Sequence, residues 1–372
     1  MPDLRSLLER EMQEIRPPGY TIVDVAHRRE RRTRNQRIGA AIVALVVAAV
    51  TIVGLLQVLQ HDRSNVPAEP SVVRNGRIAF VSPGESGPED RIYTVAPDGT
   101  DMRPLLPTIG AEYPAWSPDG SKLAFDDGST IAIRDWSSAQ GHIYFVNGDG
   151  TGLTQVTSGE GAEFTPAWSP DGTHIAVTAT GQAGSPPGIF ALDLATGQMH
   201  PITANPYAGY LDKEPDYSPD GTQIVFVRDR QLVDAGASRD REALFVVNVD
   251  GKGLRQLTPW GAGVGTPSWS PDGSTVVFRG GVVGQPAGPS QIFVIGANGR
   301  GMRQLTFGSK AASFWPSWSP DGSSIIFTRW DFAADQGGGA FELRSMRPNG
   351  SGNGPVLQSD VGGNEASWGT GA

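Results

Sequence analysis

The sequence predicts an all-β protein: a six-bladed β-propeller of four-stranded antiparallel blades, preceded by one transmembrane helix. Three observations lead to this prediction. A Pro-x-aromatic-Ser-Pro-Asp-Gly string recurs five times between residues 114 and 327. Short β-rich runs, separated by Asp-Gly or Asn-Gly turns, fill the intervals, and an uncharged apolar stretch precedes the first copy. Self-similarity with a period near 50 residues is typical of propellers.

The aromatic residue of the repeat marks the innermost strand of each blade. Its successive intervals are 52, 49, 52 and 49 residues, and a further Trp follows the fifth copy after 50 residues. We expect each ring to be buried between neighbouring blades, where it stabilises the ring of blades. The six positions are Trp116, Trp168, Tyr217, Trp269, Trp318 and Trp368.

The Ser-Pro-Asp-Gly segment after each aromatic predicts a tight turn, because Pro restricts φ and Gly accepts a positive φ. We assign these turn residues, like the aromatics, a structural role and no catalytic one. The aspartates of the turns are Asp119, Asp171, Asp220, Asp272 and Asp321.

Each repeat contains four short runs, which we name strands A to D from the inside of the blade outward. Residues 76–80 and 91–95 supply strands B and C with no strand A before them, whereas 365–371 supply a strand A with nothing after it. The two halves complete each other. A sixth blade built from both ends of the propeller closes the ring and removes its open edges.

The repeat resembles the WD-like propeller repeats of the TolB family, whose signature is the Pro-x-Trp-Ser-Pro-Asp-Gly turn followed by an apolar strand. The resemblance covers residues 75–372. It departs from the signature at Tyr217 and in the last copy, where Gly369-Thr370 replaces Pro-Asp. The resemblance implies a TolB-like six-bladed propeller.

The apolar stretch at 38–59 contains 22 residues without a charge, enough to span a bilayer of about 30 Å. A buried core helix and a cleaved signal peptide are the alternatives to an uncleaved signal anchor, which we favour because 37 residues precede the stretch. The positive-inside rule predicts a cytoplasmic tail at 1–37, a transmembrane helix at 38–59, a linker at 60–74 and an extracytoplasmic propeller at 75–372. The arginines behind this orientation are Arg28, Arg29, Arg31, Arg32, Arg34 and Arg37.

The predicted tail begins with leucines at helical spacing, so residues 3–15 are expected to form an amphipathic helix. This helix either binds a cytosolic partner or lies on the membrane. The layout of helix, Pro-Pro and arginine run is similar to the tails of many actinobacterial membrane proteins.

Charge and cysteine content exclude several functions. The chain has no Cys, which excludes disulfides and thiol chemistry. It carries 30 Lys and Arg against 39 Asp and Glu, and residues 1–63 hold ten of the basic and seven of the acidic residues. The remaining net charge of about −12 on residues 64–372 disfavours nucleic acid and favours cations or basic partners.

One face of the propeller is predicted to recognise a ligand, because the connections between strands B and C are long and varied there. Residues just before each strand A should surround the mouth of the central channel on this face. Four glutamates lie at such positions, and none is expected to hold the blades together. The candidate ligand-binding set is Glu112, Tyr113, Glu163, Phe164, Glu214, Thr266, Trp315 and Glu365.

The glutamates leave three interpretations open: a general acid and base, a site for a cation or basic group, or solvated surface. No Gly-x-Ser-x-Gly, phosphate loop or dinucleotide fingerprint is present, and the five histidines at 27, 61, 142, 174 and 200 are not expected to cluster. We therefore predict no catalytic residue, metal or cofactor.

The sequence favours a membrane-tethered extracytoplasmic scaffold at the cell envelope that binds a protein or a cell-wall ligand. A propeller hydrolase or lyase acting on a glycan or peptide is the first alternative, and a transmembrane sensor is the second. The identity of the ligand and the oligomeric state stay open.

Overall fold

A computed structural model describes residues 73–83, 90–106, 110–128, 141–158, 161–180, 186–203, 209–230, 241–281, 288–332, 341–357 and 363–371. All of them belong to the compact unit Val72–Ala372. The predicted cytoplasmic tail, transmembrane helix and the linker up to residue 72 lie outside the described residues. Within the described ranges, no helix is long and apolar enough to span a membrane.

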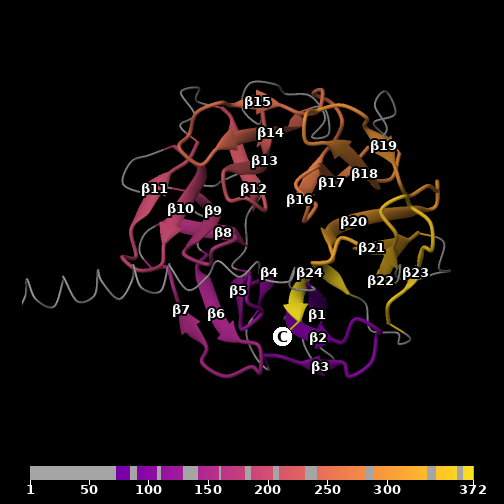
Figure 1. Cartoon of the computed structure of the whole chain (residues 1–372), viewed down its shortest axis with the longest axis horizontal. Coiled ribbons are helices and arrows are strands. Elements are labelled where there is room, and N and C mark those ends of the chain that lie inside the picture. Colours follow the sequence, from indigo (N-terminus) through magenta and orange to yellow (C-terminus); the bar gives the residue numbers. More distant parts are fainter. Residues whose placement is uncertain are drawn as a thin grey trace, which may run out of the picture. The chain divides into compact units, whose positions relative to one another are not determined.

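Six four-stranded antiparallel sheets surround a central axis (Figure 1), which confirms the predicted all-β six-bladed propeller. Blades 2 to 6 each follow the chain from the innermost strand outward. Blade 2 contains β4 (Glu112–Trp116), β5 (Lys122–Asp126), β6 (Ile143–Asn147) and β7 (Thr154–Gln155), and blade 3 contains β8 (Ala162–Trp168), β9 (His174–Thr180), β10 (Gly188–Asp193) and β11 (Met199–Pro201). Blade 4 contains β12 (Leu211–Tyr217), β13 (Gln223–Asp229), β14 (Glu242–Asn248) and β15 (Arg255–Gln256). Blade 5 contains β16 (Gly265–Trp269), β17 (Thr275–Gly280), β18 (Gln291–Gly296) and β19 (Arg303–Gln304), and blade 6 contains β20 (Ala311–Trp318), β21 (Ile325–Asp331), β22 (Phe341–Met346) and β23 (Gly354–Pro355).

Blade 1 joins the two ends of the propeller, as predicted. Its order is β24 (Asn364–Gly371), β1 (Arg74–Pro83), β2 (Asp90–Val95) and β3 (Arg103–Pro104). Strands β24 and β1 approach closely at Gly76, where a Cβ atom would lie 2.2 Å from the carbonyl oxygen of Thr370. The Thr370 hydroxyl donates to the carbonyl of Pro118 at 2.8 Å, which links the last strand to blade 2.

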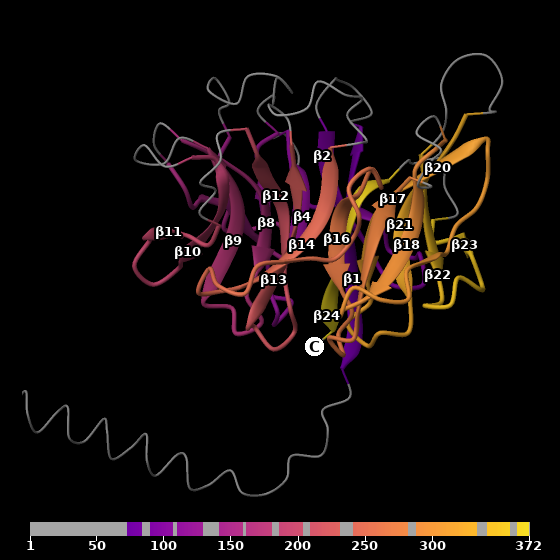
Figure 2. The ribbon, with the colours of Figure 1, turned by 90° about the horizontal axis from the view of Figure 1, so that it is seen from above.

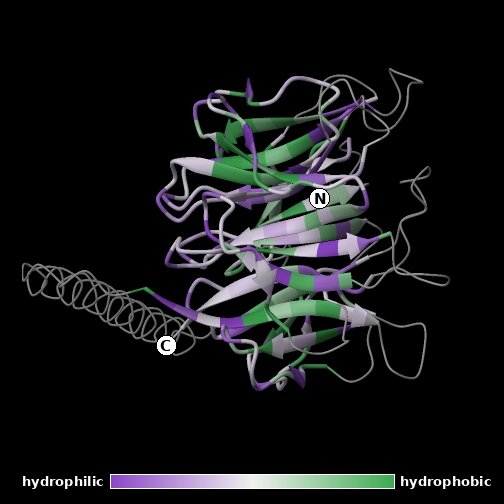
Figure 3. Cartoon of the chain, turned by 90° about the vertical axis from the view of Figure 1, so that its right-hand side faces the viewer, coloured by the Kyte–Doolittle hydropathy of each residue, from purple (hydrophilic) through white to green (hydrophobic). Residues whose placement is uncertain are grey.

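The core lies between the blades, where apolar side chains of neighbouring sheets form buried clusters. Many of the hydrophobic residues, coloured green, lie in the strands (Figure 3). Ile78 and Phe80 of blade 1, for example, form one buried cluster with Ile326 and Leu343 of blade 6. Trp168 of blade 3 stacks on Phe145 of blade 2 with a ring separation of 4.9 Å. The aromatic residues of the repeat therefore lie against the preceding blade.

The Ser-Pro-Asp-Gly turns owe their shape to one carboxylate. In the turn of blade 3, Asp171 Oδ1 accepts hydrogen bonds from the Ser169 hydroxyl at 2.6 Å and from the backbone N–H of Thr173 at 3.0 Å. Hydrogen bonds from the Ser169 hydroxyl and from the backbone and hydroxyl of Thr173 lower the pKa of Asp171 to about 2. The same Ser-to-Asp bond, 2.6 to 2.7 Å long, recurs in the other four turns.

Two ends of the propeller can now be distinguished (Figure 2). The turn face carries the Ser-Pro-Asp-Gly turns and the turns between strands C and D. The mouth face lies at the opposite end, where strand A begins and strand B ends. Candidate ligand-binding residues were predicted on the mouth face.

Candidate functional site

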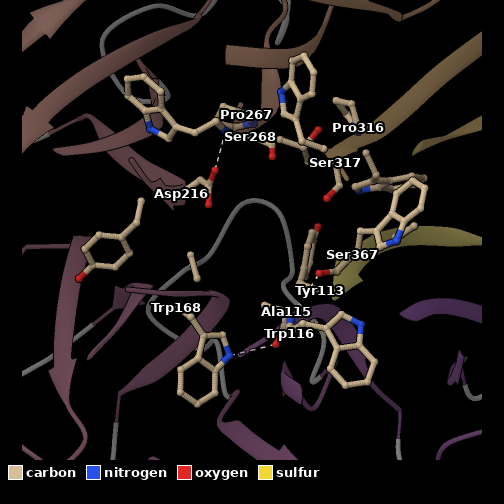
Figure 4. A pocket seen from close by; sticks show the side chains of 18 of the residues that line it. Tyr113, Ala115, Trp116, Trp168, Asp216, Pro267, Ser268, Pro316, Ser317 and Ser367 are labelled. Atoms are coloured by element: carbon tan, nitrogen blue, oxygen red, sulfur yellow. Dashed lines mark hydrogen bonds between the residues drawn. The ribbon is translucent and has the colours of Figure 1, made fainter. Parts of the chain in front are cut away.

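The innermost strands of all six blades line a central cavity of about 340 Å³ (Figure 4). Each strand contributes the segment from the residue before its Pro-x-aromatic motif to the aromatic itself; β24 has Ala366 in place of the Pro. The cavity walls mix aromatic rings, prolines, hydroxyls and carboxylates. A volume of this size is at the small end of ligand pockets, which span about 300–1,000 Å³.

Every innermost strand carries the same β-bulge near the mouth face. In β12, for instance, Lys213 pairs with Val227 and Asp216 with Val225, so one extra residue is accommodated on the inner strand. A bulge of this kind changes the direction in which a side chain points. The bulged residue has a positive φ between 44° and 55° in each blade; the six are Tyr113, Thr165, Glu214, Thr266, Trp315 and Glu365.

Positive φ is uncommon for residues other than glycine and costs free energy. Six non-glycine examples therefore form a ring at one level of the channel, and all six line the cavity. We call this set the bulge ring.

Five of the eight predicted ligand-binding residues belong to the bulge ring: Tyr113, Glu214, Thr266, Trp315 and Glu365. The other three do not line the cavity. Glu163 is 1% exposed, with Oε2 3.3 Å from His142 Nδ1, and Phe164 is 2% exposed. Glu112 lies opposite Asp126 on the neighbouring strand. The expected convergence of four glutamates is therefore wrong, since only two of them face the channel.

Thr165 and Asp216 are among the residues of the cavity wall that were not predicted from the sequence. In blade 3 the pair Glu163-Phe164 was placed one residue too early, because the bulged residue is the one directly before the Pro. Alignment of the copies on this Pro identifies Thr165. Asp216 occupies the x position of Pro-x-aromatic, where the other blades have Ala or Ser: Ala115, Ala167, Ser268, Ser317 and Ser367.

The two glutamates of the bulge ring also connect neighbouring blades, contrary to expectation. Glu365 Oε2 accepts a hydrogen bond from the backbone N–H of Tyr113 at 2.8 Å, and Glu214 Oε2 accepts one from Thr266 at 2.5 Å. Between blades 2 and 3 the acceptor is instead Asp126, which receives the N–H of Thr165 at 3.0 Å. The bulge exposes these N–H groups, so a side-chain acceptor from the preceding blade is required.

The environment of the channel shifts the pKa values of two wall residues. Burial raises the pKa of Asp216 to about 7, although the backbone N–H of Trp269 donates to its Oδ2 at 2.7 Å. Burial, with the negative charges of Glu365 and Glu214, raises the pKa of Tyr113 well above its usual value. The channel thus holds a neutral hydroxyl donor among carboxylates.

A charged cluster of blade 4 flanks the bulge ring on the mouth face. Lys213 Nζ lies 2.8 Å from Glu242 Oε1 and 4.0 Å from Glu214 Oε1. Arg228 binds both oxygens of the buried Asp212, at 2.6 and 2.7 Å. A bidentate pair of this kind has a fixed geometry, and Lys213 places a positive charge beside one carboxylate of the channel.

Two histidines lie together, contrary to the expectation that none would cluster. The rings of His174 and His200 are 6.2 Å apart in blade 3, beside a cavity of about 360 Å³ that Tyr217 also lines. Within the described ranges, no group of three or more His, Asp or Glu side chains is arranged to hold a metal ion. His27 and His61 lie outside those ranges.

The fold and the bulge-lined channel define a closed six-bladed propeller of the kind built from Trp-Ser-Pro-Asp-Gly repeats. The TolB beta propeller domain family matches residues 73–233 and 230–359, so the chain belongs to this family.

Individual relatives share the propeller over part of their length. A TolB homolog from Chlorobium luteolum is 33% identical over 161 residues, which is 34% of this chain and 36% of that protein. An uncharacterized protein from Agrobacterium fabrum is 28% identical over 50% of this chain and 60% of its own length. The chain therefore spans less than two thirds of each of these relatives. The crystal structure of TolB from Acinetobacter baumannii, at 23% identity, superposes with a TM-score of 0.59 over 79% of this chain and 66% of that one, which shows a common fold.

Proposed function

We propose that this protein is a membrane-tethered, extracytoplasmic scaffold that binds a protein or cell-wall ligand at the channel mouth. The observation that carries the proposal is the placement of Glu214, Glu365 and Asp216 on the wall of one cavity. Carboxylates in a partly desolvated cavity favour a cationic group. A lysine, arginine or amino-sugar group of the ligand fits this chemistry, and Trp315 offers an aromatic face to its apolar part.

The test removes charge without removing the hydrogen bonds between blades. In the double variant Glu214→Gln and Glu365→Gln, each amide oxygen can still accept the N–H of the next blade, so the fold should persist. A ligand captured by cross-linking on intact cells should lose about tenfold or more in affinity at low salt, since two partly buried charge pairs are lost. The affinity is measured by titration at two salt concentrations.

The matched control is Glu112→Gln with Glu163→Gln, which removes the same charge outside the cavity. This variant should bind as the wild type does. Equal affinities of all three proteins would contradict a role of the bulge ring. A hydrolase or lyase would instead turn over glycan or peptide substrates, and a sensor would lose a cytosolic response when residues 1–26 are deleted.

The tether is the second part of the proposal and depends on residues 38–59. Protease added to wall-stripped cells should remove the propeller and spare a tag at residue 1, because the arginines before the apolar stretch favour a cytoplasmic N-terminus. Western blots against both ends measure this. Protection of the propeller would contradict the proposed orientation.

A further inference from the structure

The C–D turns of the turn face differ in charge from one side of the ring to the other. Asp98, Asp149 and Asp250 occupy one turn position in blades 1, 2 and 4, where each accepts the backbone N–H two residues ahead, as in Thr100 to Asp98 at 3.0 Å. Asn298 and Asn349 accept the same bond in blades 5 and 6, at 3.0 and 2.9 Å. The change from Asp to Asn keeps the turn and removes a negative charge. Turn geometry therefore does not require the negative charge of the aspartates.

Basic residues gather where these carboxylates are missing, because Arg300, Arg303 and Arg347 are exposed on the C–D turns of blades 5 and 6 or directly after them. In blade 4, which keeps Asp250, the Lys252 side chain is 82% exposed and its Nζ lies 3.4 Å from Asp250 Oδ2. Arg303 Nη2 donates to the carbonyl of Pro348 at 2.8 Å, which joins the turns of blades 5 and 6. These basic residues lie on a domain whose net charge is strongly negative, and Asp272 and Asp321 line the same hollow as Arg303.

Exposed apolar side chains alternate with these charges. Leu254 is 46% exposed two residues after Lys252, and Met302 is 40% exposed between Arg300 and Arg303. Basic side chains around exposed apolar ones favour the boundary between headgroups and acyl chains of an anionic bilayer. We define the basic turn patch as Lys252, Leu254, Arg300, Met302, Arg303 and Arg347.

The polypeptide enters the propeller on this same face. Arg74 pairs with Gly371 at the turn-face end of β24, and Asn75 Oδ1 accepts the N–H of Asp321, which belongs to the Ser-Pro-Asp-Gly turn of blade 6. Only 13 residues, 60–72, separate the apolar stretch from the first described residue. Fully extended, these 13 residues span at most about 43–47 Å. A path along a blade from the turn face to the mouth face would use about 25 Å of that length.

We propose that the basic turn patch lies against the anionic lipid headgroups of the membrane that tethers the chain, so that the channel mouth points away from this membrane. The inference rests on the proposed tether. Charge complementarity, the exposed Leu254 and Met302, and the point of chain entry support the same face.

Because the chain contains no Cys, one introduced cysteine can carry a fluorescent label at a single known position. The full chain with Met302→Cys is labelled and reconstituted into phosphatidylcholine vesicles that contain about 30% phosphatidylglycerol and a lipid-borne quencher. The label at 302 should be quenched. A label on Lys310→Cys, exposed just before β20 on the mouth face, should not be.

The dependence on charge identifies the lipid. Quenching at 302 should fall at least twofold in vesicles without phosphatidylglycerol, at about 0.5 M salt, or with Arg300→Gln, Arg303→Gln and Arg347→Gln combined. The same number of charges removed elsewhere, by Arg77→Gln in blade 1, Lys122→Gln in blade 2 and Arg329→Gln near the mouth-face end of β21 in blade 6, should leave the quenching unchanged.

Two failures are distinguishable. A chain that a carbonate wash extracts from the vesicles contradicts the tether. A chain that stays embedded overturns the inference if the 302 label is unquenched or if its quenching ignores the anionic lipid. Cross-linking of the 302 label to a protein in cells, without lipid contact, overturns it as well.

Discussion

Removal of residues 365–372 is expected to prevent the propeller from closing. These residues form nearly all of β24, the strand that pairs with the inner edge of β1. Trp368, which packs on the core between blades 6 and 1, is lost with them, as is the bond from Thr370 to Pro118. Loss of a core Trp alone costs about 3–5 kcal/mol, against a total stability of about 5–15 kcal/mol for a typical domain.

The unit Val72–Ala372 with this deletion should therefore aggregate or melt far below the intact unit in a thermal scan followed by circular dichroism. The single change Thr370→Ala is the matched control, because it removes one hydrogen bond worth about 1 kcal/mol and leaves β24 in place. Equal melting temperatures of the truncated and intact units would mean that β24 does not close the ring.

Replacement of Asp216 by Ser is expected to stabilise the propeller above pH 7. The pKa of Asp216 is raised to about 7 by burial, whereas an unfolded Asp has a pKa near 3.9. As pH rises from about 4 to 7, the unfolded chain releases this proton and the folded chain keeps it, so stability is lost over this range. The shift corresponds to roughly 4 kcal/mol in full, and we expect about 1–3 kcal/mol because water in the channel screens part of it.

Another blade of this chain already has serine at the position of Asp216. Ser367 occupies the same position in blade 1, and its hydroxyl accepts the N–H of Trp116 at 3.4 Å, as Asp216 does for Trp269. Urea unfolding of wild type and Asp216→Ser at pH 5 and pH 8 should show that the variant gains more unfolding free energy at pH 8 than at pH 5. Ala115→Ser in blade 2 is the control without a titrating group. An equal difference in unfolding free energy between the two proteins at pH 5 and pH 8 would contradict the raised pKa of Asp216.

The candidate site could be predicted only in part. Five residues of the bulge ring were found because the repeat aligns the blades to within one residue. Glu112, Glu163 and Phe164 were misplaced, since the residues just before each strand A were chosen without knowledge of the bulge, and the pair in blade 3 was placed one residue too early. A bulge adds one residue to the inner strand and reverses which side chains face the channel. The proximity of His174 to His200 depended on how β9 and β11 flank β10 in the sheet, which no repeat in the sequence reports.

The sequence by itself determined the propeller, its blade number and its closure. The reason is that these features follow from short-range chemistry: turns built by Ser-Pro-Asp-Gly, strands of alternating or buried apolar residues, and two half-blades that need each other. Only the tertiary structure decided which carboxylates enter the channel and what they do there. Glu214 and Glu365 hold the N–H groups of the next blade, and Asp216 keeps its proton near neutral pH, because residues from neighbouring repeats enclose each of them. Contacts between repeats of this kind are set by the closed ring, and no single repeat contains them.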